Sequence, residues 1–168
     1  MKISVIITAH NDVVTLANAV HSVLDQSYPA DEIIVVDDGS SDASSEVAKN
    51  FDEVSLLRQS HMGTFSARNN GVFMASNNWI AFLDAGEQWS VEKLKKQVAY
   101  HQKDKISKIS VYDNSECLDL KEALAKGRVK SSAVMMEKKL FDQLGGFDEG
   151  FEMSEDDELW LRVLEAVK

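Results

Sequence analysis

Acidic side chains stand at the points where two apolar runs of the sequence end. Asp37 and Asp38 close one run, and Asp84 closes another. Glu87 follows three residues after Asp84. A carboxylate in this position can accept hydrogen bonds from the ring N–H and the ribose hydroxyls of a nucleotide. It can also hold a divalent cation that bridges phosphates, because Mg²⁺ and Mn²⁺ prefer oxygen ligands.

The end of the first apolar run also carries polar side chains, among them Thr8 and Asn11. An acidic residue at a strand end has a structural use as well, because it can cap the helix that follows. For any single residue that use is the simpler explanation. Asp37 and Asp38, however, precede Gly39 and lie several residues before the next predicted helix, farther than capping requires. As a set, these residues therefore favour a binding site.

Two other segments add charged groups. Arg68 lies on a predicted helix after Gly63 and can offer hydrogen-bond donors to the same ligand, although alone it is explained by exposure to solvent. Near the end of the chain, the stretch SEDDELWLR places acidic residues before an apolar helical face. A structural explanation covers Glu155 to Glu158 as a group: Ser154 caps the helix, and acidic residues in the first turn complement the helix dipole. This explanation does not distinguish one of these acidic residues from the others.

The elements that must position these residues are short apolar runs alternating with amphipathic stretches. Uninterrupted apolar runs predict strands covered on both faces, and apolar residues at helical spacing predict the helices between them. Strands are predicted over 3–9, 32–42 (stopping at Asp37), 54–59 and 78–86. Helices are predicted over 12–27, 41–51, 63–76 and 90–103, with Asp12, Ser41 or Asp42, Gly63 and Ser90 at their starts.

This alternating order predicts an α/β fold with a mostly parallel sheet, helices on both faces and right-handed crossovers. Ligands of such a sheet bind outside the carboxyl ends of its strands. The pattern weakens beyond about residue 104. There we predict strands over 108–113 and 129–136, and helices over 117–127, 138–144 (ending at Gly145 and Gly146) and 154–168. No repeat or linker interrupts the sequence, so we expect one domain over 1–168.

The chain has 168 residues, of which 44% are hydrophobic and 27% charged, and its formal net charge is −10. The composition is typical of a globular domain, and the acidity argues against binding nucleic acid or anionic lipid. The single cysteine, Cys117, cannot form an intramolecular disulfide and fits a reducing compartment. No segment approaches the ~20 apolar residues of a membrane span. We expect a cytosolic protein, and a position at the inner face of the membrane, through a partner or another segment, stays open.

The four histidines are spread along the chain, at positions 10, 21, 61 and 101. Zinc sites usually show ligands at close spacing in the sequence. The sequence therefore predicts no zinc site.

Several longer stretches, taken in order, resemble a family 2 glycosyltransferase with the GT-A fold. They are SVIITAHND, SVLDQSYPADEIIVVDDGSSD, SARNNGVFMASNNWIAFLDAGEQW, VMMEKKLFDQLGGFDEGF and SEDDELWLR, and they cover residues 3–99 and about 129–163. The string QSYPADEIIVVDDGSSD is highly specific for the family, whereas VDDGS alone would be weak evidence for it. The resemblance implies a Rossmann-like αβα sandwich. Its nucleotide-binding half would span about 1–100, and the half with the acceptor site and catalytic base about 101–168.

The resemblance also implies roles for individual positions. Thr8 and Asp38 match positions that contact the nucleobase, and Asp37 lies beside them. Arg68 matches an arginine near the nucleotide. Asp84 begins the segment that resembles the DXD motif, which holds the ribose and a divalent metal ion.

The implied chemistry is inversion at the anomeric carbon of the sugar. Asp156, beside Glu155, matches the catalytic base, and it would take a proton from the acceptor hydroxyl as that oxygen attacks. Glu149 lies in a stretch that borders the acceptor. The implied cofactor is Mg²⁺ or Mn²⁺, which stabilises the departing nucleoside diphosphate. The implied partners are a nucleoside-diphosphate sugar, a UDP-sugar by default, and a hydroxyl of a glycan or lipid-linked glycan.

Two features depart from the family pattern. Gly86 stands where the family commonly has an Asp that ligates the metal, and Glu87 is the nearest replacement. The segment between Asp84 and Val129, and the one after Arg162, are shorter than usual. The alternative prediction is therefore a nucleotide-sugar-binding domain that has lost catalysis, or a transferase without a full acceptor site.

Two other proteins with parallel sheets fit less well. A phospho-receiver domain would carry its acidic pair after the first strand, whereas here the pair follows the second strand. A Rossmann dehydrogenase would show a glycine-rich fingerprint after the first strand, and this sequence has none there.

Overall fold

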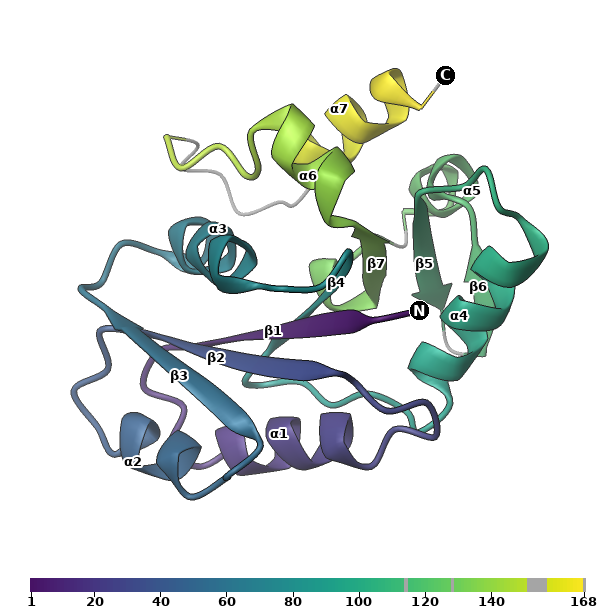
Figure 1. The fold of residues 1–168 in the computed structure, drawn as a ribbon. Coiled ribbons are helices and arrows are strands. Elements are labelled where there is room, and N and C mark those ends of the chain that lie inside the picture. The colour runs from purple at the N-terminus through teal and green to yellow at the C-terminus, as the bar shows by residue number, and fades with distance from the viewer. Residues whose placement is uncertain (114, 128, 151–156, 168) are drawn as a thin grey trace.

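The computed structural model describes residues 1–113, 115–127, 129–150 and 157–167. Their centre is a seven-stranded sheet with the order β3-β2-β1-β4-β7-β5-β6 (Figure 1). The strands are β1 (Ile3–Ala9), β2 (Glu32–Asp38), β3 (Val54–Gln59), β4 (Trp79–Asp84), β5 (Ile109–Asp113), β6 (Glu116–Leu118) and β7 (Val134–Glu137).

Four neighbouring strands, β3, β2, β1 and β4, run parallel to one another. The other pairings, β4 with β7, β7 with β5 and β5 with β6, are antiparallel. The predicted α/β fold with a mostly parallel sheet is therefore confirmed. All the antiparallel pairings involve strands from the part of the sequence where the alternating pattern weakens.

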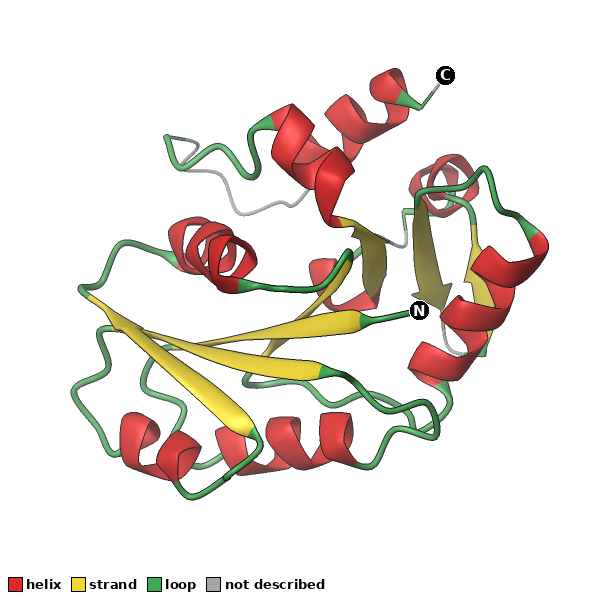
Figure 2. Ribbon diagram, viewed as in Figure 1, coloured by secondary structure: helices red, strands yellow, loops and turns green. Residues whose placement is uncertain are grey.

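Helices connect the parallel strands, because a parallel connection must cross from one end of the sheet to the other (Figure 2). The connecting helices are α1 (Leu16–Leu24), α2 (Ser44–Lys49) and α3 (Thr64–Met74), and the later helices are α4 (Lys93–Lys103), α5 (Leu120–Ala125), α6 (Lys138–Leu144) and α7 (Asp157–Ala166). A short 3₁₀ helix, η1 (Ser131–Ala133), precedes β7. In the described part of the chain, no helix has the length and apolar character needed to cross a membrane.

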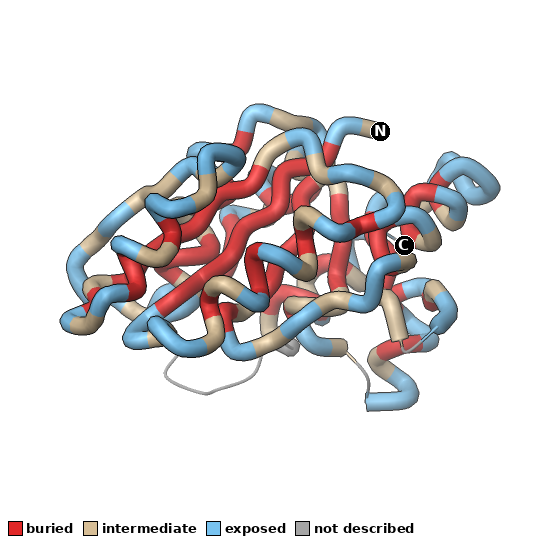
Figure 3. The backbone as a smooth tube through the Cα atoms, turned by 90° about the horizontal axis from the view of Figure 1, so that it is seen from below, coloured by how far each residue is buried: buried red, intermediate tan, exposed pale blue. Residues whose placement is uncertain are grey.

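The two faces of the sheet pack against different helices, which makes the predicted αβα sandwich. Ile6 and Phe82 belong to the apolar core with α3, α5, α6 and α7. Their chain neighbours Ile7 and Leu83 belong to the core with α1, α2 and α4. Successive side chains of a strand point to opposite faces, so a strand buried on both faces needs an unbroken apolar run. Figure 3 shows the central strands buried along most of their length.

Helix α3 lies close against β1. A Cβ atom at Gly71 would be 2.4 Å from Ile6 Cγ2, so only glycine fits at this contact. Arg68 lies one turn earlier on the same face of the helix. The close approach at Gly71 therefore holds Arg68 against the sheet.

Three predicted helix starts are wrong. Helix α2 begins at Ser44 with Ala43 as its N-cap, so neither Ser41 nor Asp42 is the cap. Helix α1 begins at Leu16 rather than near Asp12, whose carboxylate instead accepts the backbone N–H of His10 at 2.8 Å. Helix α4 begins at Lys93 with Glu92 as its N-cap, so Ser90 is not the cap. In each case a turn of the preceding loop contains residues that the hydrophobic periodicity alone assigns to the helix.

The region after α4 also differs from prediction. Residues 116–118 pair with β5 as strand β6, so the predicted helix 117–127 begins only at Leu120. Its N-cap is Asp119, which accepts the backbone N–H of Glu122 at 2.8 Å. The predicted strand 129–136 begins only at Val134, after the 3₁₀ turn. The predicted stop of α6 at Gly145 is confirmed, because Gly145 has a left-handed conformation with φ 80°.

Candidate functional site

Thr8 and Asp84 lie side by side at the carboxyl ends of β1 and β4, because they are partners in the parallel register. The Thr8 hydroxyl donates a hydrogen bond to Asp84 Oδ1 at 2.9 Å. On the other side of β1, Asp37 is the register partner of Ala9. The structure therefore brings these three predicted site residues to one edge of the sheet.

Arg68 reaches this edge from α3. Its Nη2 atom lies 3.0 Å from Asp84 Oδ1 and 3.1 Å from Oδ2, and its guanidinium lies 5.3 Å from the ring centre of Phe147. The Arg68 side chain is only 5% exposed, whereas that of Asp84 is 41% exposed. The pair thus fixes the carboxylate from the protein side and leaves part of it open to a ligand.

Asp38 is buried at the end of β2 and binds the loop after β3. Its carboxylate accepts the backbone N–H of Met62 at 2.8 Å and that of Gly63 at 2.9 Å, and the amide of Gln59 at 2.8 Å. Burial acts to raise the pKa of Asp38, but these hydrogen bonds and the nearby His61 outweigh burial and lower the pKa below its ordinary value. Asp38 is therefore held as a carboxylate in a fixed position.

Asp37 has a similar environment within the β2–α2 connection. Its carboxylate accepts the backbone N–H of Ser40 at 2.9 Å and the hydroxyl of Ser45, and it lies 3.6 Å from Arg58 Nε. Burial acts to raise the pKa of Asp37, but the serine hydrogen bonds and the charge of Arg58 outweigh it and lower the pKa. With 1% exposure, Asp37 shapes the loop from inside the protein.

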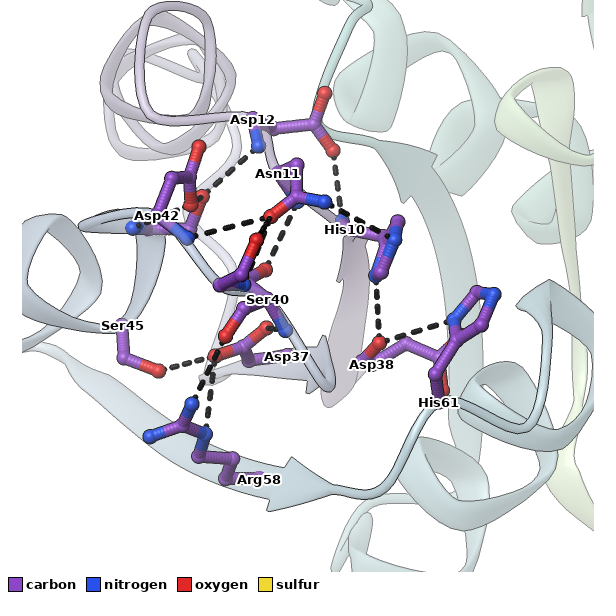
Figure 4. A network of polar contacts seen from close by, with 12 residues as sticks. His10, Asn11, Asp12, Asp37, Asp38, Ser40, Asp42, Ser45, Arg58 and His61 are labelled. Atoms are coloured by element: carbon purple, nitrogen blue, oxygen red, sulfur yellow. Dashed lines mark hydrogen bonds and ion pairs between the residues drawn. The ribbon is translucent and has the colours of Figure 1, made fainter.

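Asn11 joins the loops that follow β1 and β2, as Figure 4 shows. It adopts a left-handed conformation with φ 58°, which asparagine tolerates better than most residues. Its side-chain oxygen accepts the backbone N–H groups of Ser41 at 2.8 Å and Asp42 at 3.3 Å. These internal contacts give Asn11 a structural role at the rim of the site.

Glu149 is held by Asn69, a residue that the sequence does not single out. The Asn69 amide nitrogen donates to Glu149 Oε1 at 2.8 Å and to the carbonyl of Phe147 at 2.9 Å. Its oxygen accepts the backbone N–H of Phe147 at 2.9 Å. Asn69 therefore ties the predicted acceptor-side segment to α3, next to Arg68. The predicted base Asp156, together with Glu155 and the cap Ser154, lies outside the described residues.

Asp84 and Glu87, the two predicted metal ligands, share one turn, in which the Glu87 N–H donates to the Asp84 carbonyl at 2.9 Å. Both offer carboxylate oxygens, the donor type that suits Mg²⁺ and Mn²⁺. Each already has a cationic partner, Arg68 at 3.0 Å and Lys130 at 3.6 Å. The donor set therefore fits a hard divalent cation, which Asp84 would hold.

A pocket of about 660 Å³ opens beside this turn. Its lining includes Glu87, Trp89, Lys93, Tyr112 and Lys130. The Trp89 indole is fixed by a 2.8 Å hydrogen bond from its Nε1 to the carbonyl of Ser132. Trp89 lies within the stretch SARNNGVFMASNNWIAFLDAGEQW. No local pattern in the sequence indicates Tyr112 or Lys130 as pocket residues. They reach the pocket because β5 and the segment before β7 fold back beside α4.

This arrangement can be compared with known proteins. The model of glycosyl transferase family 2 matches residues 4–158, which include Thr8, Arg68, Asp84 and Glu87. The chain belongs to glycosyl transferase family 2. One similar protein is WfgD of Escherichia coli, named UDP-Glc:alpha-D-GlcNAc-diphosphoundecaprenol beta-1,3-glucosyltransferase. It is 32% identical over 127 residues, which are 74% of this chain and 49% of WfgD.

Solved structures share the GT-A fold of this family 2 chain. TarS of S. aureus matches with a TM-score of 0.81 at 18% identity, over 97% of this chain and 55% of the TarS chain. TarS has also been solved with UDP and with UDP-GlcNAc. The mannosyltransferase PcManGT of Pyrobaculum calidifontis, solved with GDP-Man and Mn²⁺, matches with a TM-score of 0.74 at 19% identity, over 89% of this chain and 48% of PcManGT. The chain thus spans about half the length of these relatives.

Proposed function

We propose that this chain is the donor-binding and catalytic domain of an inverting glycosyltransferase that moves a sugar from a nucleoside-diphosphate sugar to a hydroxyl group. The observation that carries the proposal is the meeting of Thr8, Arg68 and Asp84 at the carboxyl ends of β1 and β4. Open α/β sheets bind their ligands at this edge. Family membership supports the reaction class. UDP as the nucleotide is supported by the name of WfgD and by the TarS complexes.

The proposed nucleotide site runs along the strand ends. Asp38 and Thr8 would contact the nucleobase, with Asp37 shaping the loop behind them. Asp84 would bind the ribose, and Arg68 would keep its carboxylate oriented. Asp84, with Glu87 in the same turn, would hold a Mg²⁺ or Mn²⁺ ion, which would supply positive charge to stabilise the departing diphosphate.

Asp156 is the proposed catalytic base. It directly precedes α7, whose residues Leu159, Trp160 and Val163 are fully buried. Asp156 would accept the proton of the acceptor hydroxyl while the acceptor oxygen attacks the anomeric carbon, opposite to the leaving diphosphate. The configuration at that carbon is then inverted.

The pocket beside Glu87 is the proposed sugar-binding side of the site. Trp89 and Tyr112 offer aromatic surfaces, and Ser90, Glu87 and Lys130 offer polar groups. Such a mixture suits a carbohydrate, which has both apolar faces and hydroxyls. The name of WfgD includes a diphosphoundecaprenol-linked sugar, so we include lipid-linked glycans among the proposed acceptors. Such an acceptor would bring the enzyme to the inner face of the membrane.

A second candidate is a nucleotide-sugar-binding domain without catalysis. The observation that favours it is that both carboxylates of the metal turn already pair with cationic side chains, Asp84 with Arg68 and Glu87 with Lys130. Gly86 between them adds no ligand. If a metal ion cannot compete with these side chains, donor binding would be metal-independent.

Calorimetric titration with UDP and with GDP, in the presence and absence of Mn²⁺, tests both candidates. We expect Mn²⁺-dependent binding of UDP that weakens at least tenfold in Asp84→Ala. Asp142→Ala, which removes an exposed carboxylate from α6, is the matched control and should bind as wild type. Absence of binding under every condition would rule out both candidates.

Turnover separates the two candidates. Asp156→Asn should keep UDP binding. The rate of sugar transfer, or of the slow hydrolysis of the donor, should fall by a factor of about 10²–10⁴, the usual contribution of a general base. Equal turnover in this variant would remove Asp156 as the base. Metal-independent binding with no turnover in the wild type would favour the second candidate.

A further inference from the structure

His10 and His61, which are far apart in the sequence, lie face to face at the carboxyl end of β2. Their ring centres are 4.1 Å apart, and the ring planes differ by 25°. His10 follows β1, and His61 lies in the loop between β3 and α3. Figure 4 shows both rings beside Asp38. The tertiary structure therefore creates a pair of imidazoles where the sequence shows no ligand spacing.

Asp38 contacts the same ring nitrogen, Nδ1, of both histidines. His10 Nδ1 lies 2.7 Å from the backbone oxygen of Asp38, and His61 Nδ1 lies 2.9 Å from Asp38 Oδ2. A carbonyl oxygen can only accept, so His10 Nδ1 carries a proton and its Nε2 presents a lone pair. In agreement, the amide nitrogen of Asn11 lies 3.2 Å from His10 Nε2 as a donor. Metal-binding histidines commonly have their other nitrogen bonded to a carboxylate or carbonyl in this way.

The three groups share one small volume. One ligand atom from each of His10, Asp38 and His61 lies within 4.8 Å of the other two. A four-coordinate Zn²⁺ with bonds of about 2.1 Å needs ligand atoms about 3.4 Å apart. Both imidazoles are exposed and can turn, whereas Asp38 is fixed by the backbone of Met62 and Gly63. Rotation of the two imidazole side chains would have to bring their Nε2 atoms to this separation.

We propose that His10 and His61, oriented by Asp38, form a site for a late first-row transition metal ion such as Zn²⁺ or Ni²⁺. Imidazole favours these ions, whereas the oxygen ligands of the Asp84 turn suit Mg²⁺ and Mn²⁺. The two sites therefore differ in both place and metal preference. An ion bound at the nitrogen edges of the two rings would lie at the same strand end as the proposed nucleobase contact of Asp38 and would compete with nucleotide binding.

The test is a calorimetric titration of Zn²⁺ into the whole chain, without nucleotide and without Mg²⁺ or Mn²⁺. We expect one ion per chain, bound at least tenfold more weakly in both His10→Phe and His61→Phe. Phenylalanine keeps an aromatic ring for the stack but has no nitrogen, so it separates the loss of a ligand from the loss of packing. His21→Phe changes an exposed histidine on α1 and should bind Zn²⁺ as wild type.

The proposal is wrong if His10→Phe and His61→Phe bind Zn²⁺ as tightly as the wild type, or if His21→Phe weakens binding to the same extent. Circular dichroism and thermal unfolding without metal establish that each variant is folded. If either phenylalanine variant is unfolded, the Gln variant at that position takes its place. Because nucleotide is absent, a failure of the proposed transferase function would leave this result unchanged.

Discussion

One guanidinium nitrogen of Arg68 lies 3.0 Å and 3.1 Å from the two carboxylate oxygens of Asp84. The contact joins α3 to the end of β4, and a hydroxyl from β1 completes it. The guanidinium is nearly buried, and the carboxylate is partly open. The pair therefore stabilises the fold and prepares the carboxylate for a ligand.

Removing Arg68 should destabilise the protein. In Arg68→Met we expect the free energy of unfolding to fall by about 1–3 kcal/mol, less than for a fully buried pair because solvent screens Asp84. Urea unfolding of Arg68→Met, Asp84→Asn and the double variant measures the coupling between them. Strictly additive losses would contradict an energetic role for the pair.

Adding a carboxylate at position 86 tests whether the Asp84 turn binds a metal ion. A Cβ atom at Gly86 meets no heavy atom within 4 Å, and its backbone conformation is not left-handed, so a side chain fits without strain. Gly86→Asp should strengthen Mn²⁺-dependent UDP binding about tenfold, because it adds an oxygen ligand to the Asp84 turn. Gly86→Ala is the control and should bind as the wild type does. Equal binding by both variants would show that the turn does not hold the ion.

Lys93 makes the free energy of unfolding depend on pH. It is 1% exposed, its ammonium lies 4.0 Å from the centre of the Trp89 ring, and burial lowers its pKa from 10.5 to about 7. Between about pH 7 and 10 the unfolded chain holds a proton that folded Lys93 has lost. The stability therefore rises with pH across this window, by up to about 1.4 kcal/mol per pH unit.

Lys93→Met removes this titration and keeps most of the apolar volume. The unfolding free energy of the wild type, minus that of Lys93→Met, should therefore increase between pH 7 and 9. Urea unfolding at both pH values measures the change. A difference that does not vary with pH would mean that Lys93 titrates normally.

His101 should make the protein sensitive to acid. Its ring is buried against Trp79, and burial lowers its pKa from 6.5 to about 4. Between these values the unfolded state binds a proton that the folded state does not. The stabilisation is thus complete above about pH 6.5 and is lost as the pH falls toward 4, by roughly 2 kcal/mol between pH 6.5 and 5.

The chemical shift of the His101 ring, followed by NMR, measures this pKa directly. The exposed His21 serves as the internal comparison in the same spectra. Titration of His101 near 6.5 would contradict the prediction. In His101→Gln, the loss of stability between pH 6.5 and 5 should be smaller than in the wild type.

Much of the fold follows from local sequence patterns. The apolar runs of β1, β2 and β4 are long and unbroken because both of their faces are covered, and this can be read without any knowledge of the partners. Helix starts are less predictable. The turn after Asp12 and the loop after Ser90 contain residues whose periodicity continues that of the helices, so only the backbone hydrogen bonds reveal where each helix begins.

The α/β fold and the position of Thr8, Asp38 and Asp84 at strand ends can be read from the sequence, because periodicity and strand ends are local properties. Which side chains meet at those ends depends on the tertiary fold. It paired Arg68 with Asp84, stacked His10 on His61, and inserted β7 between β4 and β5. These contacts join residues that are distant along the chain, and their geometry depends on strand register and close packing, which no local pattern encodes.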